Sequence, residues 1–359
     1  MTLWYIYPTF KHVSFSVIAQ EHITQLRNFF WVESLDENII PLLDFSTRPF
    51  VILHPYFFPL QRFETYIKNY KDKFDGLVGV DVADSNRITH YAVSLTDYAD
   101  ALVVPSNYAK NSYVRSGVRK PVYVVPHGVH DYWITTAKQE PIVFPKLDLV
   151  KRKGYKLLLS YIMHSEYRKG YDLLNKIYTQ VRKEMENVRL VIKTNNGTFL
   201  ADKNVEDRAS LIPNPWLTEI EEMVLFDACD IYLLTSRGGG FEHPPLKAVA
   251  RGLPVVAPKG GAWEDYLPSW SLVESKPSGV VLDGNAIHNG TGVEIDVERA
   301  TDKVFKIIDD LEKYKEKAEV YANSYIRGYF TWNAIGQKLA NIVEEVYENA
   351  RKQRVVLKS

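Results

Sequence analysis

Short apolar runs alternate with segments of helical period along the first third of the chain. The apolar runs are too short for helices, and apolar residues recur every three or four positions in the longer segments between them. The runs fall at residues 3–7, 50–53, 76–82, 101–104 and 122–125, and the helical segments at 17–30, 60–70, 88–98 and 107–116. Apolar strands joined by helices are typical of βαβ units, so the pattern predicts a parallel sheet.

The alternation stops after residue 128 and then returns. Residues 131–153 have mixed character, with Pro141, Pro145 and the charged KRKG run from Lys151. Beyond them the predicted strands are 157–163, 188–193, 231–235, 254–257 and 279–282, and the predicted helices are 170–184, 220–228, 245–251, 297–325 and 334–351. The second part of the chain therefore repeats the layout of the first.

This layout predicts an α/β protein with two Rossmann-like halves. We expect an N-terminal domain over residues 1–135, joined by the last helix at about 330–352, and a C-terminal domain over 150–328. Ligands of such sheets bind beyond the carboxyl ends of the strands. Two sheets that face each other would form a cleft there, and we expect function in the loops at this edge.

Composition narrows the classes of partner. The 44 basic and 44 acidic side chains cancel, so net charge does not support nucleic-acid binding. The single cysteine, Cys229, excludes an internal disulfide framework and fits a packed thiol in a reducing compartment. The N-terminus lacks the pattern of a signal peptide, and no run reaches the ~18–20 apolar residues that span a bilayer. We expect a cytoplasmic protein, and contact with the inner membrane surface stays open because a patch formed on folding leaves no trace in the sequence.

The most informative segment is a glycine run between a predicted strand and a predicted helix. Ser236 and Arg237 follow the apolar run IYLLT and lead into Gly238, Gly239 and Gly240. Glycines permit positive φ and leave backbone N–H groups uncovered, and a helix N-terminus favours an anion. The turn therefore predicts a phosphate-binding loop, with a ligand-free tight turn as the alternative.

The flanks of this turn resemble a known family. The segment SRGGGFEHPPLKAVARGLPVV lies in register with the pattern S-x-x-E-G-F-G-x-x-x-x-E-A-x-A-x-G-x-P-V-V of the family 4 retaining glycosyltransferases, which have the GT-B fold. Further resemblance lies in the segments PHGV, YRKGYDLL, GGAWE and YFTWNAIGQKL. The resemblance implies two Rossmann-like domains, a last helix that returns to the first domain, and transfer of a sugar from a nucleotide-sugar donor to a glycan, lipid or protein acceptor. It also implies that no metal or other cofactor is needed.

Two positions depart from that pattern. The family has glutamates that bracket the donor, the first near the transferred sugar and the second commonly at the ribose hydroxyls, and this chain has Gly239 and Lys247 there. A carboxylate accepts hydrogen bonds from a diol, whereas an ammonium only donates. Glu242 is the candidate to replace the first carboxylate. An atypical donor, a rearranged ribose contact and a weakened or non-catalytic nucleotide-sugar-binding protein remain open, and Lys247 could also be a surface residue.

Cations beside this turn are predicted to hold the donor's diphosphate. Arg168 and Lys169 follow the first strand of the second half, and Lys193 ends the next strand. Fixed cations can neutralise a leaving diphosphate without a metal ion. With Gly239, Gly240, Phe241 and Lys247 they form the predicted donor site, although solvated loop charges are the alternative for the cations.

The first half offers fewer candidates. Asp81 follows a predicted strand and, by resemblance, would act near the transferred sugar and the acceptor, so we predict Asp81 and Glu242 as catalytic residues; a turn or helix cap is the alternative for Asp81. His54 ends another strand as either a ligand contact or a structural histidine. A nicotinamide dehydrogenase is disfavoured because the segment PTFKHVSFS after the first strand has no glycine. No motif for a metal site is evident.

Overall fold

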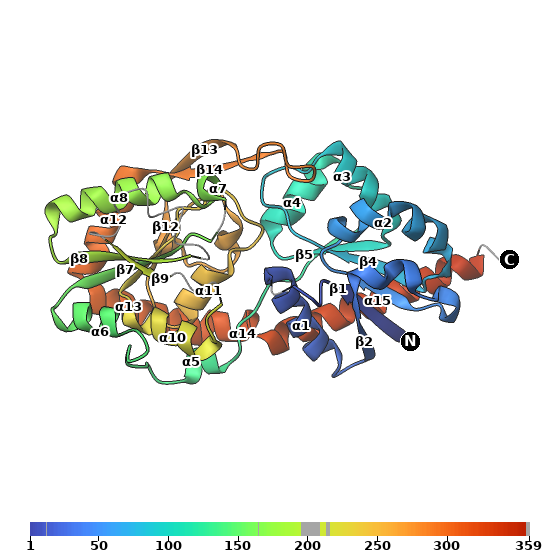
Figure 1. The fold of residues 1–359 in the computed structure, drawn as a ribbon, viewed down its shortest axis with the longest axis horizontal. Helices are drawn as coiled ribbons and strands as arrows, with labels where there is room; N and C mark the ends of the chain where they lie inside the picture. Colours follow the sequence, from blue (N-terminus) through green and yellow to red (C-terminus); the bar gives the residue numbers. More distant parts are fainter. Residues whose placement is uncertain (12, 164, 195–208, 213–215, 357–359) are drawn as a thin grey trace. The chain divides into compact units, whose positions relative to one another are not determined.

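The computed structural model describes residues 1–11, 13–163, 165–194, 209–212 and 216–356. These residues form two units. Unit 1 contains Met1–Gly128, Asp283–Gly290 and Trp332–Ser359, and unit 2 contains Val129–Leu282 and Thr291–Thr331. Each unit is built around its own six-stranded parallel sheet (Figure 1).

Unit 1 has the strand order β2-β1-β3-β4-β5-β6. Its strands are β1 Thr2–Tyr7, β2 Trp31–Asp36, β3 Phe50–Leu53, β4 Gly76–Val80, β5 Ala101–Val104 and β6 Val122–Val124. Its helices are α1 Ser14–Leu26, α2 Phe57–Tyr70, α3 His90–Leu95, α4 Asn107–Ser116 and α15 Trp332–Val356. Helices α2, α3 and α4 pack on one face of the sheet, and α1 and α15 pack together on the other. The predicted return of the last helix to the first half of the chain is therefore confirmed.

Unit 2 has the strand order β12-β11-β10-β7-β8-β9, which is the Rossmann order. Its parallel strands are β7 Lys156–Tyr161, β8 Val188–Lys193, β9 Ala209–Ile212, β10 Ile231–Leu233, β11 Val255–Pro258 and β12 Leu272–Val273. An antiparallel hairpin adds β13 Ser275–Val280 and β14 Thr291–Ile295, and the residues that connect its strands, Asp283–Gly290, belong to unit 1.

The helices of unit 2 cover both faces of its sheet. They are α5 Tyr132–Thr135, α6 Pro145–Arg152, α7 Glu166–Lys169, α8 Tyr171–Glu184, α10 Glu219–Ala228, α11 His243–Ala250, α12 Val297–Asp309, α13 Leu311–Tyr321 and α14 Arg327–Tyr329. Apolar side chains of α8 and α12 pack on one face, and those of α10 and α11 pack on the other. Both faces are buried, which is why the strands are near-continuous apolar runs in the sequence.

Several elements differ from the prediction. Strand β2 was not predicted because it lies at the sheet edge, where most of its side chains are exposed or half-buried and the apolar signal is weak. The single helix predicted over 297–325 is interrupted at Asp310, whose backbone angles (φ −116°, ψ 38°) end α12 before α13 begins. Strands β9, β12 and β14 were also missed, and each is short or half-exposed.

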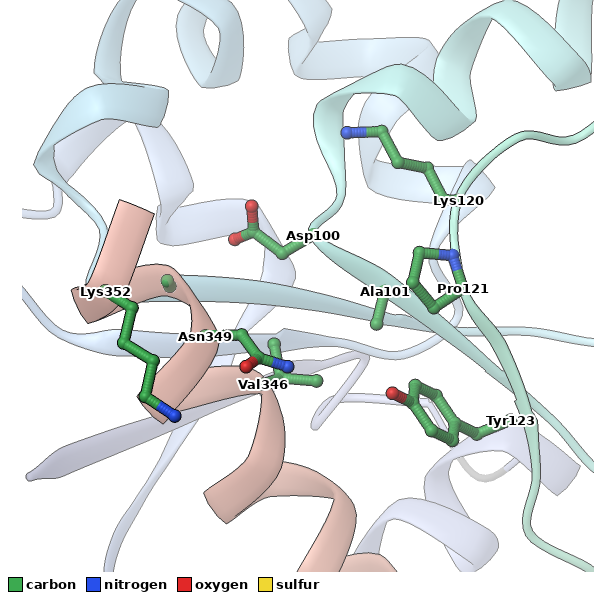
Figure 2. A pocket seen from close by; sticks show the side chains of 9 residues that line it. Asp100, Ala101, Lys120, Pro121, Tyr123, Val346, Asn349 and Lys352 are labelled. Atoms are coloured by element: carbon green, nitrogen blue, oxygen red, sulfur yellow. The ribbon is translucent and has the colours of Figure 1, made fainter. Parts of the chain in front are cut away.

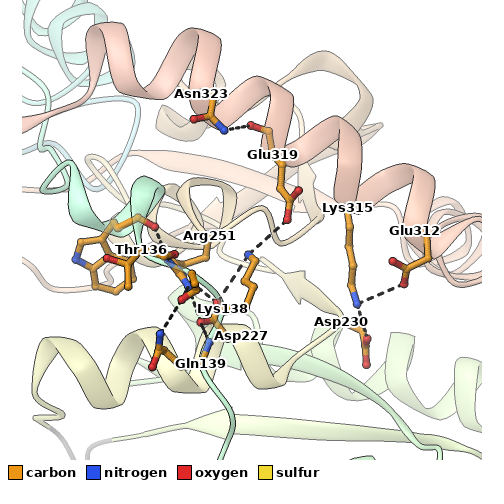
Figure 3. A network of polar contacts seen from close by, with 12 residues as sticks. Thr136, Lys138, Gln139, Asp227, Asp230, Arg251, Glu312, Lys315, Glu319 and Asn323 are labelled. Atoms are coloured by element: carbon orange, nitrogen blue, oxygen red, sulfur yellow. Dashed lines mark hydrogen bonds and ion pairs between the residues drawn. The ribbon is translucent and has the colours of Figure 1, made fainter.

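A buried ion pair fastens the segment after Val129 to the core of unit 2 (Figure 3). The guanidinium of Arg251 bonds both carboxylate oxygens of Asp227, with Nε–Oδ1 at 2.9 Å and Nη2–Oδ2 at 2.6 Å. The same guanidinium donates to the carbonyl oxygens of Trp133, Thr136 and Ala137. Five donors in a fixed fork suit this task, because one side chain from the end of α11 bonds both a buried carboxylate and the carbonyl groups at and after the C-terminus of α5.

Candidate functional site

The strand order of unit 2 reverses at β7, because β8 lies on one side of it and β10 on the other. At such a switch point the loops after the two neighbouring strands separate and leave a crevice, which is where ligands bind in open α/β sheets. Here those loops are the Arg168–Lys169 segment after β7 and the glycine run after β10. Much of the predicted donor site therefore lies at the switch point.

Backbone contacts join these two loops. The N–H of Arg237 donates to the carbonyl oxygen of Arg168 at 2.7 Å, and the Thr235 hydroxyl donates to that of Lys169 at 3.1 Å. Gly170 makes the approach possible: its φ is +68°, and a Cβ there would lie 2.0 Å from the carbonyl oxygen of Thr235. No other residue fits this position, so the Lys-Gly pair of the YRKG segment has a packing cause.

Arg237 holds the joined loops on the rest of unit 2. Its guanidinium makes a bidentate pair with Asp172, at 2.7 Å for both bonds, and donates to Glu294 of β14 at 3.0 Å. It also lies 4.1 Å from the ring centroid of Tyr167. The side chain is buried and fully engaged, so Arg237 supports the turn rather than pointing to a ligand.

A buried charge cluster lies within the joined loops. The Lys169 ammonium lies 2.7 and 2.6 Å from the two carboxylate oxygens of Glu242. Arg168 Nη1 lies 3.8 Å from Glu242 Oε1 and donates to the carbonyl oxygen of Gly238 at 3.1 Å. Two cations and one carboxylate leave a net positive charge beside the glycine run, and such a charge favours an anionic ligand.

Glu242 and Gly239 have exchanged the roles that the family pattern gives these two positions. Glu242 stands where the pattern has its second glycine, and its backbone adopts the left-handed conformation (φ 64°, ψ 84°) that costs a non-glycine residue about 1–2 kcal/mol. Its carboxylate reaches back, so that a Cβ on Gly239 would lie 2.4 Å from Oε1. A carboxylate is thus present beside Gly239, although the chain supplies it from a different position.

Tyr266 holds the same turn in place. Its hydroxyl donates to the carbonyl oxygens of Phe241 and Glu242, at 3.0 and 2.5 Å. The Phe241 ring packs on Tyr266 at 4.9 Å between centroids and is buried. Phe241 therefore shapes the turn through its side chain, and a contact with a ligand would have to come from its backbone. Gly240 lies in the same turn, beside Gly239.

Lys247 and Lys193 belong to a second cluster in unit 2. The Lys247 ammonium lies 2.5 Å from Glu222 Oε2 and 4.9 Å from the ring centroid of Trp133. Glu222 also accepts from the Tyr161 hydroxyl at 3.1 Å, and the Lys193 ammonium lies 5.7 Å from the Tyr161 ring. Glu222 was not among the predicted site residues. The sequence did contain a signal for its position: the Thr218-x-x-Glu221 capping box marks the start of α10, and Glu222 lies in the first turn of that helix.

Burial changes the acidity of this cluster. It lowers the pKa of Lys193 to about 8, against the attraction of Glu222 and together with the repulsion of Lys247. The phenol of Tyr232 links the two clusters, since burial raises its pKa and the charges of Glu242 and Glu222 raise it further. Both carboxylates therefore act on the acidity of the same buried hydroxyl group.

Asp81 lies in unit 1, directly after β4. Its carboxylate is buried and accepts from the backbone N–H groups of Phe57 and Val82, at 2.9 and 2.8 Å. Burial raises the pKa of Asp81 to about 7, against the effect of these hydrogen bonds. The carboxylate thus holds the start of α2, and its catalytic role stays a prediction.

His54 lies in a buried network of unit 1. The Tyr5 hydroxyl lies 2.9 Å from Nδ1 of His22 and 2.8 Å from Nδ1 of His54. Burial lowers the pKa of His22 to about 4, and burial together with His22 lowers that of His54. Of the two alternatives for His54, this network supports the structural one.

A hollow of about 360 Å³ lies in unit 1, at the end of the sheet opposite to the carboxyl ends of its strands (Figure 2). Ala101 begins β5 there, and the lining includes Asp100, Lys120, Tyr123 and Lys352. Asp100 accepts from the N–H of Leu77 at 2.8 Å, so its carboxylate pins the start of β4. The hollow lies at the amino ends of the strands, where α/β sheets rarely bind ligands.

Among the residues that the structure describes, no three His, Cys, Asp or Glu side chains are grouped so as to hold a metal ion. No helix in this part of the chain is both long enough and apolar enough to cross a membrane.

Comparison with known proteins gives matches in sequence and in fold. The family model described as Glycosyl transferases group 1 matches residues 156–281. Uncharacterized protein 356 of Sulfolobus islandicus rod-shaped virus 1 is 32% identical over 369 residues, which cover 97% of this chain and 99% of that protein. The matched family segment contains both charge clusters of unit 2 except Trp133.

Two solved structures share the fold. Sucrose-phosphate synthase (tll1590) from Thermosynechococcus elongatus has a TM-score of 0.70 at 12% identity, over 97% of this chain and 99% of that one. The E. coli trehalose-6-phosphate protein bound with UDP-2-fluoro glucose has a TM-score of 0.68 at 10% identity, over 96% and 99%. The predicted GT-B fold is confirmed.

Proposed function

This chain belongs to the group 1 family of glycosyl transferases, which take sugars from nucleotide-sugar donors, and we propose that it is a retaining enzyme that works without a metal ion. The observation that carries the proposal is the joined pair of loops at the switch point of unit 2. There the Lys169 ammonium and the Arg168 guanidinium lie beside the glycine run, and Arg168 donates to the carbonyl oxygen of Gly238. Such a site suits a diphosphate.

The charges of the reaction fit this site. As the bond from the anomeric carbon to the diphosphate oxygen breaks, negative charge grows on the diphosphate and positive charge grows on the sugar ring. Arg168, Lys169 and Lys193 would stabilise the first charge and the Glu242 carboxylate the second. The acceptor oxygen then forms its bond to the same face of that carbon, and the proton of the acceptor hydroxyl passes to the departing diphosphate oxygen. Three fixed cations supply the stabilisation that a metal ion would give elsewhere.

A nucleotide screen followed by sugar transfer tests this proposal. We expect one of UDP, GDP, ADP or TDP to raise the melting temperature, with UDP tested first because a GT-B neighbour holds a UDP sugar. Transfer to an acceptor panel should be insensitive to EDTA. Stabilisation by none of the four nucleotides would contradict the proposal, and donor binding without turnover on a broad panel would overturn the transfer activity.

Substitution of Glu242 tests its role. Glu242→Gln keeps the shape of the side chain and removes its charge, so turnover should fall about 100-fold while the nucleotide still binds. Glu274→Gln is the matched control, because that carboxylate is 68% exposed and pairs with Lys259 on the surface. Equal turnover in the two variants would remove Glu242 from the mechanism.

Unit 1 takes the acceptor in this proposal, with Asp81 as the candidate residue nearest the chemistry. Its strand order reverses between β1 and β3, and the segments after these strands carry the exposed rings of Phe10 and Phe58. The Lys11 ammonium lies 5.0 and 5.5 Å from their centroids. Exposed aromatic and basic side chains suit an acceptor at an anionic lipid surface.

Co-sedimentation with vesicles tests this surface. Binding to anionic vesicles and not to neutral ones is expected, with loss of binding in Phe58→Asp. If the wild-type protein stays in solution with both kinds of vesicle, the acceptor is not presented by a membrane.

A further inference from the structure

Glu222 places a carboxylate against Lys247, which lies in α11, seven residues after the end of the glycine run. The two side chains come from different helices, α10 and α11, and their charged atoms are 2.5 Å apart. Each side chain is about one-seventh exposed, at 15% for Glu222 and 14% for Lys247. The pair is thus neither a solvated surface contact nor sealed in the core, and a ligand can reach it.

The Glu222 carboxylate has capacity left for a ligand. Oε2 is bonded to Lys247 and Oε1 accepts from Tyr161, whereas a carboxylate offers about four lone-pair positions. Lys247 is in turn held over the Trp133 ring, so the carboxylate has a fixed orientation. A fixed carboxylate with two open positions is suited to a vicinal diol, whose two hydroxyls can each donate to it.

The position of Glu222 in unit 2 indicates which diol of the donor its carboxylate would bind. Glu222 accepts from the Tyr161 hydroxyl, and the Lys193 ammonium at the end of β8 lies 5.7 Å from the same Tyr161 ring. Tyr161 itself ends β7, the strand of the switch point where the diphosphate is proposed to bind. In Rossmann-type sites an acidic side chain near the switch point accepts hydrogen bonds from the ribose of the nucleotide. Glu242 already serves the sugar side of the diphosphate, so Glu222 is left for the nucleoside side.

We propose that Glu222, positioned by Lys247, accepts hydrogen bonds from the ribose hydroxyls of the donor and makes the enzyme selective for ribonucleotides. The proposal rests on the proposed function, since it assigns a residue within the same donor site. Lys247 cannot itself bind the ribose diol as an acceptor, because an ammonium only donates hydrogen bonds. In this proposal it instead orients the Glu222 carboxylate that does. The ribose contact has moved from α11 to α10.

The test compares each ribonucleotide with its 2′-deoxy counterpart. Calorimetric titration with UDP and dUDP, and with GDP and dGDP, gives the ratio of the two affinities for each base. Loss of hydrogen bonds to a charged group predicts that the wild-type protein binds the ribonucleotide at least about tenfold more tightly. In Glu222→Gln the ratio should fall to about two or three, while affinity for the deoxynucleotide changes little.

A neighbouring residue provides the control. Glu219→Gln changes the same charge on the same turn of α10, but Glu219 is exposed and its carboxylate bonds to Trp133 Nε1 at 3.3 Å. Its ribo-to-deoxy ratio should equal that of the wild-type protein. The exchange variant Glu222→Lys/Lys247→Glu should restore the ratio, because it returns a carboxylate to the diol from the other helix.

The outcomes separate the two proposals. A wild-type protein that binds ribo- and deoxynucleotides equally, or a Glu222→Gln variant that keeps the full ratio, overturns the role of Glu222 and leaves the donor site intact. An effect on melting temperature with no change in the ratio would make the Glu222–Lys247 pair structural only, which also overturns it. Failure of every nucleotide to bind would instead refute the proposed function.

Discussion

Lys193 keeps an ammonium group where little water reaches it. The residue is 3% exposed, and burial lowers its pKa to about 8, so the folded protein releases a proton that the unfolded chain would hold up to about pH 10.4. Between these values the unfolded state binds more protons, and stability therefore rises with pH across that window. Below pH 8 the protein carries a buried charge that is unfavourable for folding. Such a charge is useful if a diphosphate neutralises it.

We therefore predict that affinity for the nucleoside diphosphate falls as pH rises above about 8. The terminal phosphate is already ionised in that range, so the loss reports the protein. Titrations from pH 7 to 9.5 should show the fall in the wild-type protein and a flat profile in Lys193→Arg, whose guanidinium stays charged. A flat wild-type profile would mean that Lys193 does not contact the ligand.

At the scale of elements, Arg251 at the C-terminus of α11 connects separate parts of unit 2. The side chains of Arg251 and Asp227 are 1% and 0% exposed. Arg251 also donates hydrogen bonds to three carbonyl oxygens of the segment that follows Val129 (Figure 3). Trp133 of that segment covers Lys247. A disturbance at Arg251 would thus reach the Glu222–Lys247 pair through Trp133.

Removal of the Arg251 side chain should cost far more stability than removal of a surface arginine. Arg251→Met leaves Asp227 buried, with the half-exposed ammonium of Lys138 3.8 Å away, and the free energy of unfolding should fall by about 3–5 kcal/mol. Arg152→Met, at a residue 75% exposed and paired with Asp148, should cost less than about 1 kcal/mol. Urea unfolding of both variants measures the difference. Equal losses in the free energy of unfolding would show that the buried Arg251–Asp227 pair does not stabilise unit 2.

At the scale of the whole molecule, the chain passes between its two units four times, after Gly128, Leu282, Gly290 and Thr331. The second segment of unit 1 is short: residues 283–290 lie between β13 and β14 and bond to the rest of unit 1 through Thr89 and Ser85. Each unit nevertheless has its own apolar core. Separate cores predict separate responses to ligand and to acid.

Calorimetric melting should show two transitions, one of which shifts with nucleotide and the other with acid. His22 is neutral when folded, with a pKa of about 4, and charges near pH 6.5 when unfolded, so its contribution is complete above pH 6.5 and is lost as pH falls toward 4. At pH 5 the loss should be about 2 kcal/mol for this residue. His22→Gln, which can still bond Tyr5, should reduce the acid shift of the unit 1 transition, and a transition that shifts with both acid and nucleotide would contradict separate units.

Much of the fold could be predicted from the sequence because parallel sheets leave a direct pattern in it. Strands buried on both faces are continuous apolar runs, and β3, β5 and α4 have the predicted bounds. The YRKG segment left a local signal for a similar reason, since the positive φ and the close backbone contact at Gly170 require glycine. The glycine run behaves differently: Gly238, Gly239 and Gly240 have no positive φ, and Gly239 instead leaves room for the Glu242 side chain. Edge strands such as β2 carry no such signal.

Only the tertiary structure decided which charges meet. Glu242 is 73 residues from Lys169 in the chain, and Lys247 is 25 residues from Glu222, yet each pair is in contact. Periodicity assigns a residue to a face of its own element, whereas the partner across that face depends on strand order and on the path of the loops. By itself the sequence showed that two carboxylates of the family pattern are missing; the structure showed that two others, Glu242 and Glu222, lie beside the same positions.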